Sequence, residues 1–317
     1  KLYKIEKMNQ RTLVVIKSMG IGDLVILIAN IHAISKSLNS KVVVLAQENT
    51  RATEILKYDP HVEEVIHLDK KGFLNIINKI KNKKFEKSYI FSDSLRLYLI
   101  SKLAGIKNNY QYEFFSKKGK NFFKAAQQFT ENTLHTKVDH QSKIFWNLEE
   151  VENAKKKFDI SNKTKNIVCG ISASGPSKRW DIKNYINLFE NISDKYPCKF
   201  FIAAGPKDKN LVKEVMSSSL KEKCISFAEM TISETIPIIS SCQTYIGNDT
   251  GWAHISAALN LKSLYLFCDS PSEAYGTWRN NIEIIIPEGE IVCKHNTRGK
   301  DRISFNEVLG KALEMIN

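Results

Sequence analysis

The sequence predicts an α/β protein built from two parallel β-sheets, each covered by helices. Short runs of β-branched and apolar residues alternate with longer helical patterns along the 317 residues. The same alternation occurs in both halves of the chain, which indicates two Rossmann-like domains. Apolar residues make up 43% of the composition, enough for packed cores in two domains of ordinary size.

The first half supplies alternating strands and helices. Its strands are expected at residues 12–17, 41–46, 62–68 and 87–92. Its helices are expected at residues 23–38, 48–57, 73–82 and 94–104. Because parallel strands require long crossover connections, this spacing predicts a parallel sheet.

The second half repeats the scheme. Its strands are expected at residues 166–171, 198–204, 224–228, 244–247 and 263–267. Its helices are expected at residues 181–195, 207–218, 231–241, 251–260 and 304–316. The polar segment 148–165 predicts the boundary, with an N-terminal domain over 1–155 and a C-terminal domain over 156–317. The last helix is a candidate to pack back on the N-terminal domain. Ligands are expected in a cleft between the domains, where the carboxyl ends of the strands lie.

Composition and charge restrict the class of protein. The apolar run 24–29 near the start is too short to span a membrane, and the prediction is a cytoplasmic protein. The closest two of the six cysteines are 18 residues apart, which predicts reduced, buried thiols and no zinc site. Residues 1–150 hold 25 Lys and Arg against 15 Asp and Glu, or +10, whereas residues 151–317 hold 22 against 19, or +3. Nucleic acid, anionic lipid or a phosphorylated acceptor would explain the basic half, and so would lysine-rich compositional bias.

The first candidate loop follows the first predicted strand. Gly20 and Gly22 are expected to let the backbone turn tightly and approach a ligand, and Asp23 falls at or near the start of a helix. Aspartate is a favoured N-cap, so capping alone also explains Asp23. The third glycine of a dinucleotide-binding fingerprint is absent.

Two further loops follow strands of the second half. The segment 170–180 combines small residues and hydroxyls, Ser174 among them, with Lys178, a composition that suits a phosphate or diphosphate. Asn248, Asp249, Thr250 and Gly251 form a polar turn that opens a helix, where backbone N–H groups bind anions. His254 lies one turn further on the same face as Thr250 and is expected near a phosphate. The alternatives are an ordinary solvated loop, a capping Asp249 and a structural histidine.

These loops, in this order and spacing, resemble family 9 glycosyltransferases, the ADP-heptose:lipopolysaccharide heptosyltransferases. The matching segments are "GDLVILIANIHAI", "SDSLRLYLISKLAGIKNNYQY", "GPSKRW" and "GNDTGWAHISAALN". The last of these is similar to the Asp-[Ser/Thr]-Gly-x-x-His signature of the family. The resemblance implies a glycosyltransferase-B fold, with the acceptor in the N-terminal domain and an ADP-sugar in the C-terminal domain.

The resemblance also implies residue roles. Asp23 matches the general base, with Gly20 and Gly22 in the acceptor-side loop. The residues that match donor-binding positions are Ser174, Lys178, Met230, Asp249, Thr250, Gly251 and His254. The acidic residue that binds ribose aligns with Lys209, and Asp208 beside it is the candidate contact. Since the chain has no Asp-x-Asp motif, direct displacement with inversion and no obligatory metal or cofactor is expected.

The expected acceptor is the anionic lipid A–Kdo core at the cytoplasmic face of the bacterial inner membrane. Segment 114–129 interleaves Phe with Lys and is a candidate for contact with that surface, although a solvated loop with two buried Phe is the alternative. A sugar-nucleotide epimerase of the same fold and a basic nucleic-acid-binding protein are the competing functions. The second of these is suggested by charge alone, and no nucleic acid is expected as a partner.

Overall fold

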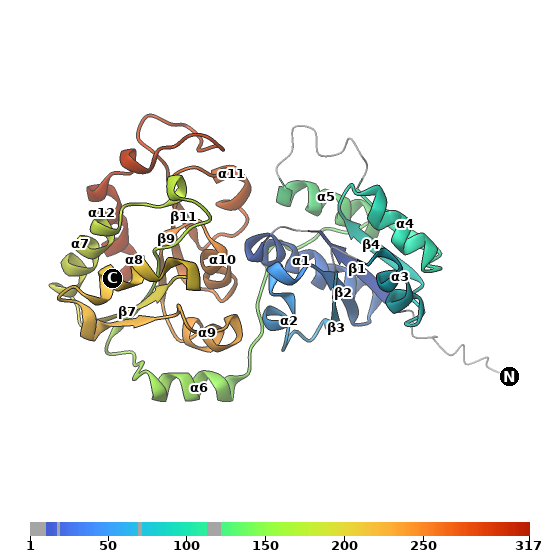
Figure 1. Ribbon diagram of the computed structural model, residues 1–317, viewed down its shortest axis with the longest axis horizontal. Helices are drawn as coiled ribbons and strands as arrows, with labels where there is room; N and C mark the ends of the chain where they lie inside the picture. The colour runs from blue at the N-terminus through green and yellow to red at the C-terminus, as the bar shows by residue number, and fades with distance from the viewer. Residues whose placement is uncertain (1–10, 18–19, 69–71, 113–121) are drawn as a thin grey trace. The chain divides into compact units, whose positions relative to one another are not determined.

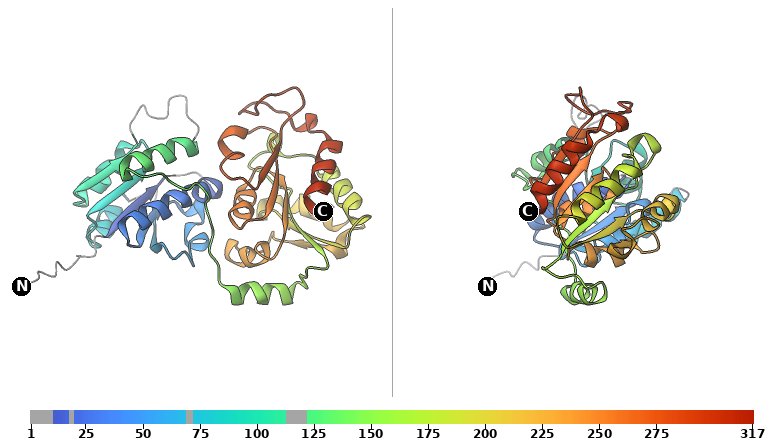
Figure 2. Two further views of the ribbon diagram at one scale, coloured as in Figure 1. Left: turned by 180° about the vertical axis from the view of Figure 1, so that it is seen from behind. Right: turned by 90° about the vertical axis from the view of Figure 1, so that its left-hand side faces the viewer.

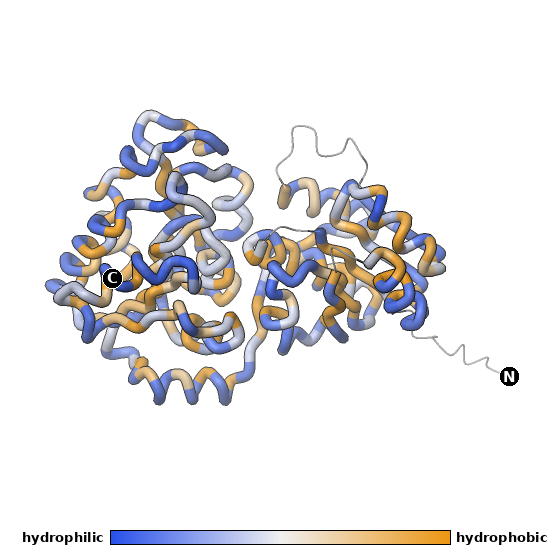
Figure 3. The backbone as a smooth tube through the Cα atoms, in the orientation of Figure 1, coloured by the Kyte–Doolittle hydropathy of each residue, from blue (hydrophilic) through white to orange (hydrophobic). Residues whose placement is uncertain are grey.

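The computed structural model describes residues 11–17, 20–68, 72–112 and 122–317. The chain forms two compact units, residues 1–140 and 141–317. Each unit is a parallel sheet with helices on both faces (Figure 1), as expected for the α/β class. Strands occupy the hydrophobic interior of each unit (Figure 3), because a sheet covered on both faces buries both sets of its side chains.

The N-terminal unit has five strands in the order β3-β2-β1-β4-β5. The strands are β1 (Thr12–Ile16), β2 (Val42–Ala46), β3 (Val62–His67), β4 (Lys87–Phe91) and β5 (Asn108–Gln111). The helices are α1 (Ile21–Leu38), α2 (Ala52–Ile55), α3 (Phe73–Lys81), α4 (Leu95–Leu103) and α5 (Phe122–Leu134). Helices α3 and α4 bury one face of the sheet, and α1 packs against α5 on the other (Figures 1 and 2).

The C-terminal unit has six strands in the order β11-β10-β9-β6-β7-β8. The strands are β6 (Lys165–Gly170), β7 (Cys198–Ala203), β8 (Cys224–Ser226), β9 (Thr244–Asn248), β10 (Lys262–Leu266) and β11 (Ile282–Ile285). The helices are α6 (Leu148–Lys157), α7 (Ile182–Ser193), α8 (Lys209–Met216), α9 (Ile232–Ile239), α10 (Gly251–Ala258), α11 (Ser272–Tyr275) and α12 (Phe305–Ile316). The core on one face joins α7, α8 and α12, so the last helix packs within its own unit.

In the sequence, the first unit ends at His140 and the second begins at Gln141, fifteen residues before the predicted domain boundary. The polar segment expected to mark that boundary begins with helix α6, which packs on α9 of the C-terminal unit. Asn147 caps α6 by accepting from two backbone N–H groups, acidic residues occupy its first turn and lysines its last. This charge order complements the helix dipole, so a segment with few apolar residues still forms a helix.

Most differences from the expected elements occur where hydrophobic periodicity is weak. Strand β5 has the polar sequence NNYQ and lies at an edge of its sheet, so it shows no apolar run. Strand β11, also an edge strand, has the apolar sequence IEII but is only four residues long, and it was not expected. The helix expected over residues 48–57 is instead a 3-10 turn followed by α2. Arg51 separates the two with a left-handed backbone, φ 56°.

Helix α1 is long and apolar enough to cross a membrane by composition, yet 61% of it is buried within the structure. Its Asn30 accepts a hydrogen bond from Thr130 of α5 over 2.8 Å, which fixes one core helix against another. All six cysteines are buried and unpaired, as expected. Burial raises the pKa of the Cys224 and Cys268 thiols to about 12, so these side chains stay neutral.

The segment expected to touch a membrane lies partly outside the described residues, which omit 113–121. Its remainder enters α5, where Phe129 packs edge-on against Phe91 and Tyr112. Thr130 and the buried alanines of α5 also face the interior of the unit. The described part of this segment therefore contributes to the core of the N-terminal unit.

Candidate functional site

The strand order of the C-terminal unit reverses between β6 and β9, which are hydrogen-bonded neighbours. The crossovers from β6 lead toward β8, whereas those from β9 lead toward β11. Loops at the carboxyl ends of two such strands diverge and leave room for a ligand. The loop after β6 holds Ser174 and Lys178, and the loop after β9 holds Asp249 and Thr250. The topology thus places both predicted donor loops at one switch point.

Two glycines allow these central strands to approach closely. Gly170 and Gly247 are register partners at the ends of β6 and β9. A Cβ on Gly247 would lie 2.5 Å from the backbone N and O of Gly170, and a Cβ on Gly170 would overlap the hydroxyl of Tyr245. With glycine at position 170, the Tyr245 hydroxyl has room to donate to the carbonyl of Asn248 over 2.7 Å. The floor of the site therefore requires glycine at both positions.

Asn248 joins the two loops. It is fully buried, and its side-chain amide donates to the carbonyls of Ile171 and Ser172 over 3.2 Å each. Its side-chain oxygen accepts from the backbone N–H of Trp180 over 3.0 Å. One side chain at the end of β9 consequently holds both ends of the loop that carries Lys178.

Ser174 is exposed on this loop, and Lys178 ends a 3-10 turn, Pro176–Lys178, with its side chain partly exposed. Next to Lys178, Ser177 donates to Oδ2 of Asp269 over 2.6 Å. Burial raises the pKa of Asp269, but hydrogen bonds from Ser177 and the backbone of Arg298, with the nearby charge of Lys178, lower it overall below its usual value. Asp269 therefore stays ionised and ties the loop to the segment after β10.

The loop after β9 is held by a chain of buried hydrogen bonds. The indole N–H of Trp278 donates to Nδ1 of His254 over 3.1 Å. Nδ1 is therefore unprotonated in neutral His254, which places the proton on Nε2, 3.1 Å from Oδ1 of Asp249. Ser270 donates to the other carboxylate oxygen of Asp249 over 2.8 Å.

His254 was expected near a phosphate from its spacing in the motif, but its side chain is buried away from solvent. It is 2% exposed, and both ring nitrogens are occupied by Trp278 and Asp249. A direct contact between His254 and a phosphate has no ring nitrogen available in this arrangement. His254 instead holds the carboxylate of Asp249 by a hydrogen bond from Nε2. The half-buried backbone of Thr250 and Gly251 begins α10, whose first N–H groups can receive an anion.

The remaining donor-side predictions lie on neighbouring loops of the same edge. Asp208 follows β7 and forms an ion pair with Arg179 of the β6 loop at 3.4 Å. Lys209, which aligns with the ribose-binding acidic residue of the family, pairs with Glu229 at 2.7 Å. Met230 follows β8 and is half-buried. All the predicted C-terminal site residues except His254 thus lie in loops or at a helix start after β6, β7, β8 and β9.

The N-terminal unit has its own switch point between β1 and β4, and α1 begins just beyond β1. The N-cap of α1 is Gly20, so Asp23 lies near the N-cap, at the third helical position, and is not itself the N-cap residue. Gly20 has φ −161° and ψ −179°, an extended conformation open to any residue. The backbone conformation of Gly20 therefore does not require glycine, and a Cβ on it would meet no atom within 4 Å. Gly22 lies inside the first turn of the helix, and Asp23 is partly exposed with its charge near the positive end of the helix dipole.

The sequence placed Asn248 in the polar turn but did not indicate its role as a link between loops, and three further residues that build the donor side, Asp269, Ser270 and Trp278, were not predicted. Asp269 and Ser270 lie shortly after the predicted strand 263–267, so their place after a strand was a usable signal. Trp278 carried no local signal, because only tertiary packing brings it to His254.

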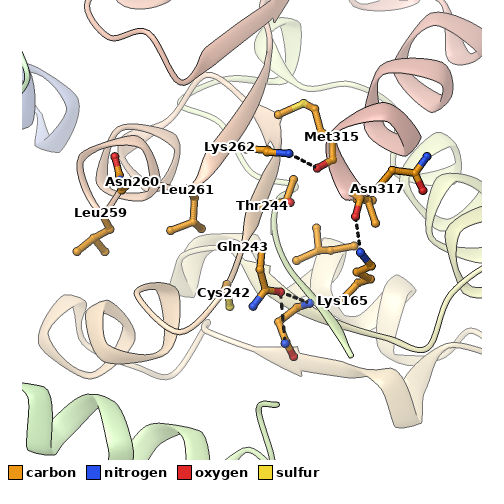
Figure 4. A pocket seen from close by; sticks show the side chains of 13 residues that line it. Lys165, Cys242, Gln243, Thr244, Leu259, Asn260, Leu261, Lys262, Met315 and Asn317 are labelled. Atoms are coloured by element: carbon orange, nitrogen blue, oxygen red, sulfur yellow. Dashed lines mark hydrogen bonds between the residues drawn. The ribbon is translucent and has the colours of Figure 1, made fainter. Parts of the chain in front are cut away.

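A cavity of about 430 Å3 occurs at the opposite edge of the C-terminal sheet (Figure 4). Its lining includes Lys165, Thr244 and Lys262, the first residues of β6, β9 and β10. The two lysines donate to the carbonyls of Ile316 and Met315 over 2.6 and 3.4 Å, respectively. These contacts give hydrogen-bond partners to carbonyls at the end of α12. The cavity lies at the amino ends of the strands and is therefore separate from the predicted donor loops, which follow their carboxyl ends.

Comparisons with known proteins agree with the loop signature. The sequence profile of glycosyltransferase family 9 (heptosyltransferase) matches residues 107–303. Lipooligosaccharide heptosyltransferase 2 of Haemophilus influenzae is 28% identical over 130 residues, which are 39% of this chain and 37% of that protein. The alignments with three such curated heptosyltransferases each span less than half of the relative's length.

Solved structures show the same fold. The ADP-heptose lipopolysaccharide heptosyltransferase II of Escherichia coli superposes with a TM-score of 0.79 at 18% identity, covering 96% of this chain and 98% of that one. An Escherichia coli heptosyltransferase solved with ADP gives a TM-score of 0.75 at 12% identity, covering 96% and 99%. This likeness confirms the predicted glycosyltransferase-B fold. The profile match spans more than half of the chain and includes every predicted donor-side residue, and on this ground the chain belongs to glycosyltransferase family 9, the heptosyltransferase family.

Proposed function

We propose that this chain is an inverting glycosyltransferase that moves a heptose from ADP-heptose to Kdo or heptose in the inner core of lipopolysaccharide. The observation that carries the proposal is the junction of two loops at the β6–β9 switch point, one bearing Lys178 and the other Asp249, in a chain of the heptosyltransferase family. The relatives named above supply the choice of heptose and of ADP as its carrier.

The donor would lie along the carboxyl edge of the C-terminal sheet. Lys178, the hydroxyl of Ser174 and the first N–H groups of α10 would bind the diphosphate, since they supply positive charge and donors. Met230 would contact the nucleotide, and Asp208 would accept from the ribose hydroxyls. These groups can neutralise a departing diphosphate, so we propose that no metal and no cofactor is obligatory.

The chemistry would be a single displacement. The acceptor hydroxyl attacks the anomeric carbon and its proton passes to the carboxylate of Asp23, which acts as general base. The new C–O bond forms as the bond between the anomeric carbon and the phosphate oxygen breaks, and ADP leaves with the electron pair. Attack opposite to the leaving group inverts the anomeric centre.

The acceptor would be the anionic lipid A–Kdo core, met by a peripheral protein at the cytoplasmic face of the inner membrane. The charge of +10 in residues 1–150 against +3 in the rest of the chain supports an anionic partner for the N-terminal half.

A transfer assay with purified protein tests the proposal. With ADP-heptose and truncated cores that end in Kdo or in heptose, one of the two acceptors should gain a single heptose by mass while ADP accumulates in equal amount. Activity should persist in excess EDTA, and UDP-glucose should not replace the donor. Release of ADP with neither core modified would contradict the proposed acceptor class.

Lys178→Ala is expected to weaken ADP binding by about tenfold or more, because a charge-assisted contact to phosphate contributes about 1.5–3 kcal/mol. Isothermal titration calorimetry measures this directly. Lys195→Ala is the matched control, since it removes the same charge from an exposed position just before β7, at the opposite edge of the sheet. Equal ADP affinity in both variants and the wild type would remove Lys178 from the diphosphate site.

A further inference from the structure

Helix α4 exposes a continuous apolar stripe. Leu95, Leu99 and Leu103, which we call the α4 stripe, are 57%, 43% and 57% exposed. Their spacing of four residues places them on one face of the helix. Leu97 and Ile100 on the other face are buried in the core of the unit, so the stripe adds nothing to that core.

The neighbouring helix α3 also exposes a large apolar side chain. It packs beside α4 (Figure 1), and the guanidinium of Arg96 lies 6.0 Å from the ring of Phe73. The next residue, Leu74, is 72% exposed. Large apolar side chains that are exposed together, rather than singly, mark an interaction surface.

The charge around the stripe is strongly positive. Helices α3 and α4 together hold four Lys and Arg and no Asp or Glu. On α4, Arg96 and Lys102 are exposed beside the leucines, and on α3 Lys79 and Lys81 are exposed as well. If two copies of the protein met through this surface, their like charges would repel each other. An anionic surface would instead complement these positive charges.

We propose that the α3–α4 face rests on an anionic lipid bilayer, with the α4 stripe at the boundary of the acyl chains and Arg96 and Lys102 among the headgroups. An apolar stripe with a basic rim is the pattern by which helices lie in a membrane interface. The inference deepens the proposed function, on which it rests for the reason to meet a membrane. It places that contact on α3 and α4 instead of on the segment expected from the sequence.

Co-sedimentation of the full chain with vesicles tests this surface without any need for activity. The wild type should bind vesicles of phosphatidylglycerol and phosphatidylethanolamine, and should bind pure phosphatidylcholine vesicles weakly. The triple variant Leu95→Gln, Leu99→Gln, Leu103→Gln should lose roughly tenfold or more of its partition coefficient. Arg96→Gln and Lys102→Gln should each lose about fivefold at low salt, and this charge-dependent difference should disappear at ~1 M salt.

Matched controls lie on α6 of the other unit. Leu148 is 80% exposed and Lys156 is exposed, so Leu148→Gln and Lys156→Gln remove similar groups and should bind as the wild type does. Calorimetry with ADP, together with circular dichroism, verifies that each variant is folded.

Wild-type protein that stays in the supernatant, or a triple variant that binds normally, would overturn the proposal. A triple variant that instead turns a wild-type dimer into a monomer would assign the surface to a second copy. Failure of the transfer assay, with vesicle binding intact, would count against the proposed reaction alone.

Discussion

Asp23→Asn is expected to lower the single-turnover rate of heptose transfer by about 10²–10⁴-fold, the usual contribution of general acid–base catalysis. The substitution preserves the size of the side chain and removes the proton acceptor. The lost interaction of Asp23 with the helix dipole should cost about 0.3–1 kcal/mol of unfolding free energy. Quenched-flow measurement with saturating ADP-heptose and acceptor gives the rate, and ADP affinity should be unchanged because the proposed donor loops belong to the C-terminal unit.

Glu149→Gln is the matched control for Asp23→Asn. Glu149 is exposed in the first turn of α6, so its loss removes the same helix-dipole interaction at a position outside the proposed site. Both variants should remain folded, and only Asp23→Asn should show a lower rate of transfer. A rate for Asp23→Asn within a few-fold of wild type would leave the proposed reaction without its base.

His254→Ala is expected to lower the unfolding free energy by about 2–6 kcal/mol and to weaken ADP binding in the molecules that remain folded. The change leaves two buried groups without their partner, the indole N–H of Trp278 and Oδ1 of Asp249, and each loss contributes about 1–3 kcal/mol. Denaturant unfolding measures the first effect. Calorimetric titration with ADP, at a temperature well below the unfolding transition, measures the second.

Two other variants separate a positioning role from simple destabilisation. His254→Gln retains an N–H group able to donate to Asp249, so it should recover part of the ADP affinity even where stability stays low. His295→Ala, at an exposed position, should change neither quantity. Unaltered ADP affinity in folded His254→Ala would show that the hydrogen bonds to Asp249 serve stability only.

Local sequence patterns were sufficient for the elements that build both sheets. Strand β2 is a continuous apolar run, and β1, β6 and β7 each contain four consecutive small or apolar residues, because both faces of a parallel sheet are buried. The donor loops could be predicted for a related reason, since Ser174, Lys178 and Asp249 follow such strands directly in the sequence. Edge strand β5 and the polar helix α6 carry weaker patterns, edge strand β11 is only four residues long, and the domain boundary was misplaced into a helix.

The sequence by itself determined the α/β class, the two-unit organisation and the family, because strand periodicity and loop signatures are local properties. The tertiary structure alone decided which loops become neighbours. Strand order sets β9 beside β6, and the long-range contacts of Asn248 with Trp180 and of His254 with Trp278 follow from it. The two contacts join residues that are 68 and 24 positions apart in the sequence, and the local hydrophobic pattern carries no information over such separations. For the same reason His254 is a buried support rather than an exposed ligand, since its exposure depends on what packs around α10 and not on its place in the motif.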